Sequence, residues 1–316
     1  MALRFAAVDL GSLTVRLAVA ELTGPGRFRV LAHYREVTGL GEGLARNDTL
    51  APEAMTRTLK ALKGVVRVMR AQGVDVSRTV ATQAVRQSRN REVFVQQVQE
   101  LGLPVRVLPP EEEARLSLKG VLSALAPEFL AAPELVVFDV GGGSSEWALI
   151  RQGREPEFAS LPLGVLTLSQ ARPLGDPPRA DAVAALKQEI KERLGEFYRQ
   201  NLQPHLSATP RLVGTAGAVT TLAALALKMR RYEAQRVNNL ILTRAQVAEL
   251  AELLCRLPEA ERARLPGMEP AKAGVMVAGV LIVLTILEIF RQDSLVTIDA
   301  GLLEGVLGEI AENLGD

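Results

Sequence analysis

Residues 135–151 read LVVFDVGGGSSEWALIR. The pattern predicts an apolar strand that ends in Asp139, a turn of three glycines, and a second strand from Glu146 to Arg151. Glycine permits unusual backbone angles and carries no Cβ, so the backbone N–H groups of such a turn can approach a ligand closely. The hydroxyls of Ser144 and Ser145 add donors suited to phosphate oxygens. We therefore predict a phosphate-holding hairpin here.

The same pattern occurs near the start of the chain. Phe5–Asp9 is an apolar run, Gly11 and Ser12 form a turn, and Val15–Glu21 is rich in β-prone residues. Asp139 follows Asp9 by 130 positions, and each is followed by a similar order of strands and helices. This repeat predicts an internal duplication and therefore two related α/β lobes with a cleft between them.

The length of 316 residues is about twice that of a typical domain, which agrees with two lobes. Pro127 and Pro133 bracket the expected boundary. The prediction is an N-terminal lobe over 1–126 and a C-terminal lobe over 127–300, with the last helix, within 301–316, packing back on the first lobe.

Further elements are expected from the spacing of apolar residues and from turn residues. Val275–Leu287 is almost wholly apolar but ends at Glu288 after about 13 residues, too short to span a bilayer, so it predicts a buried helix or a homodimer face. The other expected strands cover 28–33, 78–81, 105–108, 157–161, 211–214 and 295–298. The other expected helices lie at 52–73, within 90–101, from 110, over 181–201, from 218, over 243–256, over 270–290 and over 302–313.

Composition excludes several classes of function. Lys and Arg number 37 against 36 Asp and Glu, so no global charge points to nucleic acid or to an anionic membrane. The single cysteine, Cys255, cannot form an intramolecular disulfide, and no signal-peptide pattern is present, so a cytoplasmic location is expected. With two histidines, a His-rich zinc site is not expected.

A third glycine element, Gly214-Thr215-Ala216-Gly217, lies between an expected strand and an expected helix. Anions are often bound at such helix N-termini. One glycine turn alone is usually only a turn, and this one could be a plain strand–helix connection. Two glycine hairpins in equivalent places of a duplicated chain favour a functional interpretation.

The arrangement resembles the superfamily of actin, sugar kinases and the heat-shock ATPases. It is most similar to one branch, the exopolyphosphatase and guanosine-pentaphosphate phosphohydrolase family. The residues that carry the resemblance are AVDLGS (7–12), ATQAVR (81–86) with Asn90, EEARL (112–116) with Gly120-Val121, FDVGGGSSE (138–146), LGV (163–165), GTAG (214–217) and DAGLLEG (299–305). The resemblance implies two actin-like (ribonuclease H-like) lobes with mixed sheets and an interdomain cleft.

The resemblance implies that Glu113 is the catalytic base, since it is the second of the family's paired glutamates before alanine. A carboxylate can take a proton from the water that attacks a terminal phosphorus. From the residues alone, a structural role is favoured. Glu111, Glu112 and Glu113 follow Pro109 and Pro110 at a helix start, where acidic side chains are stabilised by the helix dipole.

The resemblance also implies a metal site and a set of phosphate contacts. Asp139 and Glu146 are expected to hold Mg²⁺ (or Mn²⁺), which prefers oxygen ligands. Arg86 and Arg16 are expected to meet phosphate oxygens through their planar guanidinium groups. The full set of expected phosphate-binding residues is Asp9, Gly11, Ser12, Leu13, Thr14, Arg16, Arg86, Gly141, Gly142, Gly143, Ser144, Ser145, Gly214, Thr215 and Lys272.

Six positions depart from the family pattern. Leu13 replaces a frequent asparagine, and Leu303 replaces a frequent arginine. The others are Ala216, Ala218, Lys272 and Gly274, where glycine, threonine, arginine and aspartate are frequent. These departures affect expected affinity and substrate choice more than the reaction, because Glu113, Asp139 and Glu146 are retained.

The function expected from these residues is hydrolysis of terminal phosphates from inorganic polyphosphate, with guanosine pentaphosphate as a further substrate. Two alternatives stay open. One is a catalytically weak regulatory protein that binds polyphosphate or a nucleotide, and the other is a small-molecule kinase of the actin fold.

Overall fold

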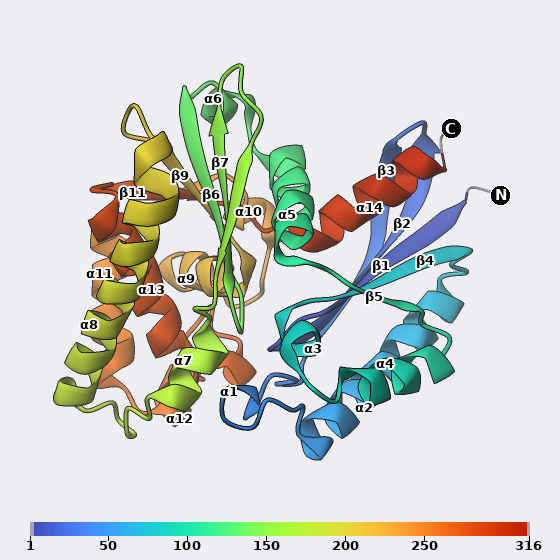
Figure 1. Ribbon diagram of the computed structural model, residues 1–316, viewed down its shortest axis with the longest axis horizontal. Coiled ribbons are helices and arrows are strands. Elements are labelled where there is room, and N and C mark those ends of the chain that lie inside the picture. The colour runs from blue at the N-terminus through green and yellow to red at the C-terminus, as the bar shows by residue number, and fades with distance from the viewer. Residues whose placement is uncertain (1–2, 315–316) are drawn as a thin grey trace. The chain divides into compact units, whose positions relative to one another are not determined.

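The computed structural model describes residues 3–314, and in it the chain divides into two units, each with its own sheet and core (Figure 1). Unit 1 contains the residues up to Ser123 together with those from Ala300 onward. Unit 2 contains Ala124–Asp299.

Unit 1 contains a five-stranded sheet in the order β3-β2-β1-β4-β5. The first three strands are antiparallel neighbours, and β4 and β5 run parallel to β1. The strands are β1 (Arg4–Leu10), β2 (Thr14–Gly24), β3 (Arg27–Val37), β4 (Val76–Ala81) and β5 (Val105–Val107). The helices are α1 (Leu44–Asn47), α2 (Pro52–Ala71), α3 (Gln83–Gln87), α4 (Arg91–Glu100), α5 (Pro110–Ala124) and α14 (Leu302–Asn313).

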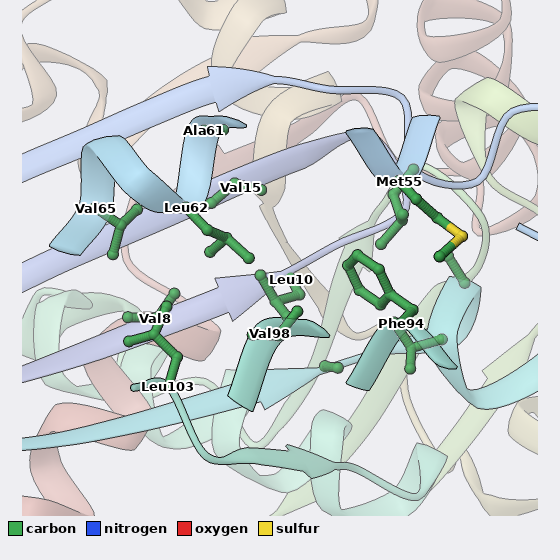
Figure 2. Close-up of a cluster of buried hydrophobic side chains, with 14 of the residues drawn as sticks. Val8, Leu10, Val15, Met55, Ala61, Leu62, Val65, Phe94, Val98 and Leu103 are labelled. Carbon is green, nitrogen blue, oxygen red and sulfur yellow. The ribbon is translucent and has the colours of Figure 1, made fainter. Parts of the chain in front are cut away.

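Both faces of β1 are buried, which explains why the strand is apolar along its length. Alternate residues such as Val8 and Leu10 pack under α2 and α4, while Phe5 and Ala7 belong to the cluster that includes α14. Fully burying a side chain of this size contributes about 1.5–3 kcal/mol. Figure 2 shows the first cluster, with Val8, Leu10, Val15, Met55, Ala61, Leu62, Val65, Phe94, Val98 and Leu103.

Unit 2 contains a six-stranded sheet in the order β10-β11-β9-β6-β7-β8. The strands are β6 (Glu134–Val140), β7 (Ser145–Arg151), β8 (Glu157–Leu161), β9 (Arg211–Thr215), β10 (Leu240–Thr243) and β11 (Ser294–Thr297). The helices are α6 (Pro127–Leu130), α7 (Val165–Ala171), α8 (Ala180–Phe197), α9 (Ala216–Ala226), α10 (Ala234–Val237), α11 (Arg244–Arg256), α12 (Glu259–Arg262) and α13 (Met276–Ile289). A π-helical turn, Tyr198–Leu202, continues α8.

The core of unit 2 is built around α13 and an aromatic group on β7. Every residue of α13 from Met276 to Leu287 is buried, so the predicted buried helix is confirmed, and its apolar surface serves the core. The ring of Trp147 stacks on that of Phe290 with 6.1 Å between the ring centroids, and its centroid lies 5.4 Å from that of Phe197. Within residues 3–314, no helix has the length and apolar character needed to cross a membrane.

The two sheets confirm the duplication that the sequence predicts. The neighbour order and strand directions of β3-β2-β1-β4-β5 recur as β8-β7-β6-β9-β11. Several details differ from expectation, because the short helices α1, α3, α6, α7, α10 and α12 were not predicted from the sequence. The edge strand β10 was not predicted, and the helix expected from 270 begins at Met276, after a short 3₁₀ turn, Pro270–Lys272. Gly274, a poor helix former, lies in the break.

Candidate active site

The two glycine hairpins close in the same way. The N–H of Gly11 donates to the carbonyl of Thr14, and the N–H of Gly141 donates to the carbonyl of Ser144, each at 3.0 Å. A Cβ on either glycine would lie 3.1 Å from that same carbonyl oxygen. Both turns are therefore tight enough to favour glycine over any larger residue.

The carbonyl groups of the first turn are used by the chain itself. The carbonyl of Leu13 accepts from the N–H groups of Thr38 and Gly39, both at 2.9 Å. The carbonyl of Ser12 accepts from the N–H of Gly41 at 2.8 Å. The segment after β3 thus fixes the orientation of this turn.

The carbonyl groups of the second turn are held by the start of α7. Gly141 O accepts from the N–H of Val165 at 3.0 Å, and Gly142 O accepts from Leu166 at 2.8 Å. Gly164 makes this possible, because a Cβ there would lie 2.4 Å from Gly142 O and from the backbone of Gly143. The LGV motif at 163–165 is therefore the support of the second glycine turn.

Apart from those of Gly11 and Gly141, N–H groups of the two turns are left open. Those of Ser12 and Leu13 in the first turn, and of Gly142, Gly143 and Ser144 in the second, have no hydrogen-bond partner among residues 3–314. Successive open N–H groups in a turn form a concave site for anions. The departure at Leu13 does not remove this backbone donor.

The two hairpins differ in the charges of the two residues that pair across their strands next to the turn. Asp9 pairs in register with Arg16, and Asp139 pairs in register with Glu146. Arg16 contacts Asp9 Oδ2 through Nε at 2.8 Å and through Nη2 at 2.6 Å, while the buried Oδ1 of Asp9 has no partner among the described residues. The first hairpin therefore carries a neutralised pair, and the second carries two carboxylates.

A polar row crosses the sheet of unit 2 next to the second turn. Thr215, Asp139, Glu146 and Ser160 are register partners on β9, β6, β7 and β8, so their side chains share one face. Glu146 is 4% exposed, and its Oε1 accepts from the hydroxyls of Ser144 at 2.6 Å and Ser160 at 3.1 Å.

This row fits magnesium by its chemistry. No group of three or more His, Cys, Asp or Glu suited to a metal occurs within residues 3–314. Magnesium usually takes only one or two carboxylates and completes its shell with water and substrate phosphates. Asp139 and Glu146 provide that number of carboxylates on neighbouring strands.

Glu113 and Arg86 contact each other in unit 1. Arg86 Nη1 lies 2.8 Å from Glu113 Oε2 and donates to the carbonyl of Leu108 at 2.6 Å. Of the glutamates at the start of α5, Glu111 is exposed, Glu112 is half-buried, and Glu113 is 8% exposed. A carboxylate removed from water to this extent needs a charged or hydrogen-bonding partner, which Arg86 supplies.

Helix α3 joins this pair to the first turn. The N–H of Thr82 donates to the carbonyl of Leu10 at 3.2 Å, and the hydroxyl of Ser12 donates to Gln83 Oε1 at 3.2 Å. Arg86 lies one turn further along α3. Gln83 was missed as a site residue, although it lies within the ATQAVR motif.

The third glycine element joins β9 to α9. Ala216 adopts a left-handed backbone with φ of 68°, a conformation that favours glycine. Lys272 is 3% exposed, and its Nζ lies 3.0 Å from Glu269 Oε2. The same Nζ would lie 3.0 Å from a Cβ on Gly217. Its ammonium group is therefore next to the N-terminal turn of α9.

Some expected phosphate contacts lie deeper in the fold than the turns do. Ser145 is fully buried, and its hydroxyl accepts from the indole N–H of Trp147 at 3.1 Å. A Cβ on Gly214 would lie 2.8 Å from the ring of Phe138. Leu303, at the start of α14, is buried in the apolar cluster that α14 forms with the sheet of unit 1, where an arginine would need a polar partner. The phosphate-binding roles of Ser145 and Gly214 stay predictions, as do those of every other residue predicted to bind phosphate.

Comparison with known proteins shows to which family the sequence and the fold are similar. Residues 19–314 match the Ppx/GppA phosphatase family. The chain is 31% identical to Exopolyphosphatase 2 of Mycobacterium tuberculosis over 98% of both chains. A solved structure of the Aquifex aeolicus Ppx/GppA family member superposes with a TM-score of 0.80, at 30% identity and over 100% of both chains. An exopolyphosphatase from Cytophaga hutchinsonii, 22% identical over 98% of both chains, shares the fold with a TM-score of 0.87.

Proposed function

This chain belongs to the Ppx/GppA phosphatase family, and we propose that it is a hydrolase that releases orthophosphate from the ends of inorganic polyphosphate. Its relative from Mycobacterium tuberculosis is named as an exopolyphosphatase. In the proposed reaction, water attacks the terminal phosphorus, and the bond to the bridging oxygen of the next phosphate breaks.

The observation that carries this proposal is the shared design of the two glycine turns. In both, carbonyl groups accept hydrogen bonds from a following segment of the chain, and the N–H groups of the residues that come after Gly11 and Gly141 are open. The open N–H groups of such a turn attract phosphate oxygens. Its carbonyl oxygens, which would repel them, are already engaged in hydrogen bonds with the chain. Each turn therefore offers donors to a phosphate group, and inorganic polyphosphate consists of such groups.

Glu113 is the proposed base. It would accept the proton that the attacking water loses, an effect typically worth about 10²–10⁴ in rate. Its burial in unit 1 and its contact with Arg86 support this role, since they fix the carboxylate in one orientation. Arg86 would neutralise charge on the transferred phosphate.

Asp139 and Glu146 are proposed to hold Mg²⁺. A bound magnesium ion neutralises charge on phosphate oxygens during transfer. The hydroxyls of Ser144 and Ser160 orient Glu146 by donating to its Oε1. The first hairpin is unsuited to holding Mg²⁺, because the carboxylate of Asp9 is paired with the positive charge of Arg16.

Guanosine pentaphosphate is a second proposed substrate, because it also ends in a phosphoanhydride. Phosphate release from long polyphosphate, short polyphosphate and guanosine pentaphosphate, each with and without Mg²⁺, tests the proposal. We expect Mg²⁺-dependent release without any acceptor molecule. Binding of polyphosphate without turnover would instead favour a regulatory protein, and transfer to an acceptor from ATP would favour a kinase.

A further inference from the structure

An open cavity of about 590 Å³ lies in unit 1, and none of its lining residues belongs to a glycine turn. One side is formed by α4 and the other by the segment that joins β5 to α5. The residues that matter for its chemistry are Arg86, Arg91, Gln96, Gln99, Val107 and Pro109. Of these, only Arg86 has a part in the proposed reaction.

The cavity contains two neighbouring arginines, since Arg91 Nη1 donates to the carbonyl of Arg86 at 3.4 Å. Arg86 and Arg91 line it together with a single acidic residue, Glu92. Both hydrogen bonds of the Arg86 guanidinium use Nη1, and its Nε and Nη2 have no partner within residues 3–314. Arginine binds phosphate best through two adjacent donors, and this pair is open.

The rest of the lining is apolar or carries amides. Val95, Val107 and Pro109 form an apolar wall, and Gln96 and Gln99 lie three residues apart on one face of α4. The volume falls in the range of sites for small organic ligands, roughly 300–1,000 Å³. A bare phosphate ion would leave the apolar wall and both amides unused.

We propose that this cavity binds a phosphorylated small molecule of nucleoside monophosphate size. The phosphate would pair with Arg86 and Arg91, and the ring would lie on the apolar wall with its polar edge toward the glutamines. Arg86 is also the residue proposed to contact the transferred phosphate. A ligand that binds Arg86 in the cavity therefore competes with the substrate for this arginine. That consequence for activity rests on the function proposed above, whereas the binding does not.

Calorimetric titration of the full chain with adenosine 5′-monophosphate tests the binding. Arg91→Glu removes a cavity cation, and its new carboxylate suits the first turn of α4, so the fold is kept. Arg89→Glu is the matched control, because Arg89 is an exposed arginine outside the cavity. We expect Arg91→Glu to bind at least about tenfold more weakly than the wild type, and Arg89→Glu to bind equally well.

Adenosine and ribose 5-phosphate separate the two halves of the ligand, and each should bind at least about tenfold more weakly than the nucleotide. The nucleotide should also raise the KM for polyphosphate in the wild type but not in Arg91→Glu. No binding to the wild type, or equal binding by Arg91→Glu and wild type, overturns the proposal. Inhibition that persists unchanged in Arg91→Glu places the nucleotide at the substrate site and also overturns it.

Discussion

Replacement of Gly164 by alanine would test how the second glycine turn is supported. The new Cβ would lie 2.4 Å from Gly142 O and from two backbone atoms of Gly143. Favourable carbon contacts begin near 3.5 Å, so the turn or the start of α7 must move by about 1 Å. No flexible side chain can absorb this change, because all three contacted atoms belong to the backbone.

The expected effects on stability and on rate differ in size. Overpacking of this kind costs about 1–3 kcal/mol, and each kcal/mol lowers the Tm of a domain of 150–250 residues by roughly 2–4 °C. A misplacement of about 1 Å at a reacting group can cost on the order of 100-fold in rate. Gly164→Ala should therefore remain folded at 25 °C and lose most of its turnover.

Orthophosphate release from polyphosphate at saturating Mg²⁺, together with a thermal melt, measures both effects. Gly195→Ala is the control, because it is the same change within α8, where a Cβ would meet nothing within 4 Å. We expect this control to keep its activity, with a small rise in Tm from the better helix propensity of alanine. Near-wild-type turnover by Gly164→Ala would refute the supporting role of this contact.

Three further predictions concern strain, pH and metal. Ala216→Gly should raise the free energy of unfolding by up to about 1 kcal/mol by relieving the left-handed backbone, and a fall in Tm would contradict this. Burial raises the pKa of Glu309, but the hydrogen bond from Arg115 and the charges of Arg115, Arg78 and Lys119 together outweigh it and hold that pKa below its ordinary value of 4.5. The ionised Glu309 therefore stabilises the fold above pH 4.5, and this contribution is lost as the pH falls through the lower pKa of the folded state. The loss of stability caused by Glu309→Gln should then be smaller at acid pH. A loss of stability that does not depend on pH would contradict this prediction. Glu146→Gln should raise the Mg²⁺ concentration for half-maximal phosphate release, and an unchanged Mg²⁺ titration would exclude it as a ligand.

The parts of the fold that depend on local chemistry could be predicted. The two hairpins follow from apolar runs that end at Asp9 and Asp139 and from the glycines that come next. The strands of both sheets other than β10 follow from apolar and β-prone runs, and the buried helix α13 follows from an almost wholly apolar stretch. The order of elements indicated the duplication. Each of these signals lies within a short window of sequence.

The supports of the turns could not be predicted, because they come from distant segments. Nothing local shows that residues within 38–41 and 165–167 would donate to the carbonyls of the two turns. Gln83 is similar, since its contact with Ser12 requires the packing of α3 against the first hairpin. The strand β10 has only four residues at a sheet edge, too few for a clear alternating pattern.

The central claim is that Glu113 activates the water that attacks the terminal phosphate. The most direct measurement is kcat for orthophosphate release by Glu113→Gln, with Glu111→Gln, an exposed glutamate in the same helical turn, as the control. We predict a fall in kcat of about 10²–10⁴ for Glu113→Gln with retained fold and polyphosphate binding, and no change for Glu111→Gln. A Glu113→Gln protein that turns over at nearly the wild-type rate would contradict the mechanism.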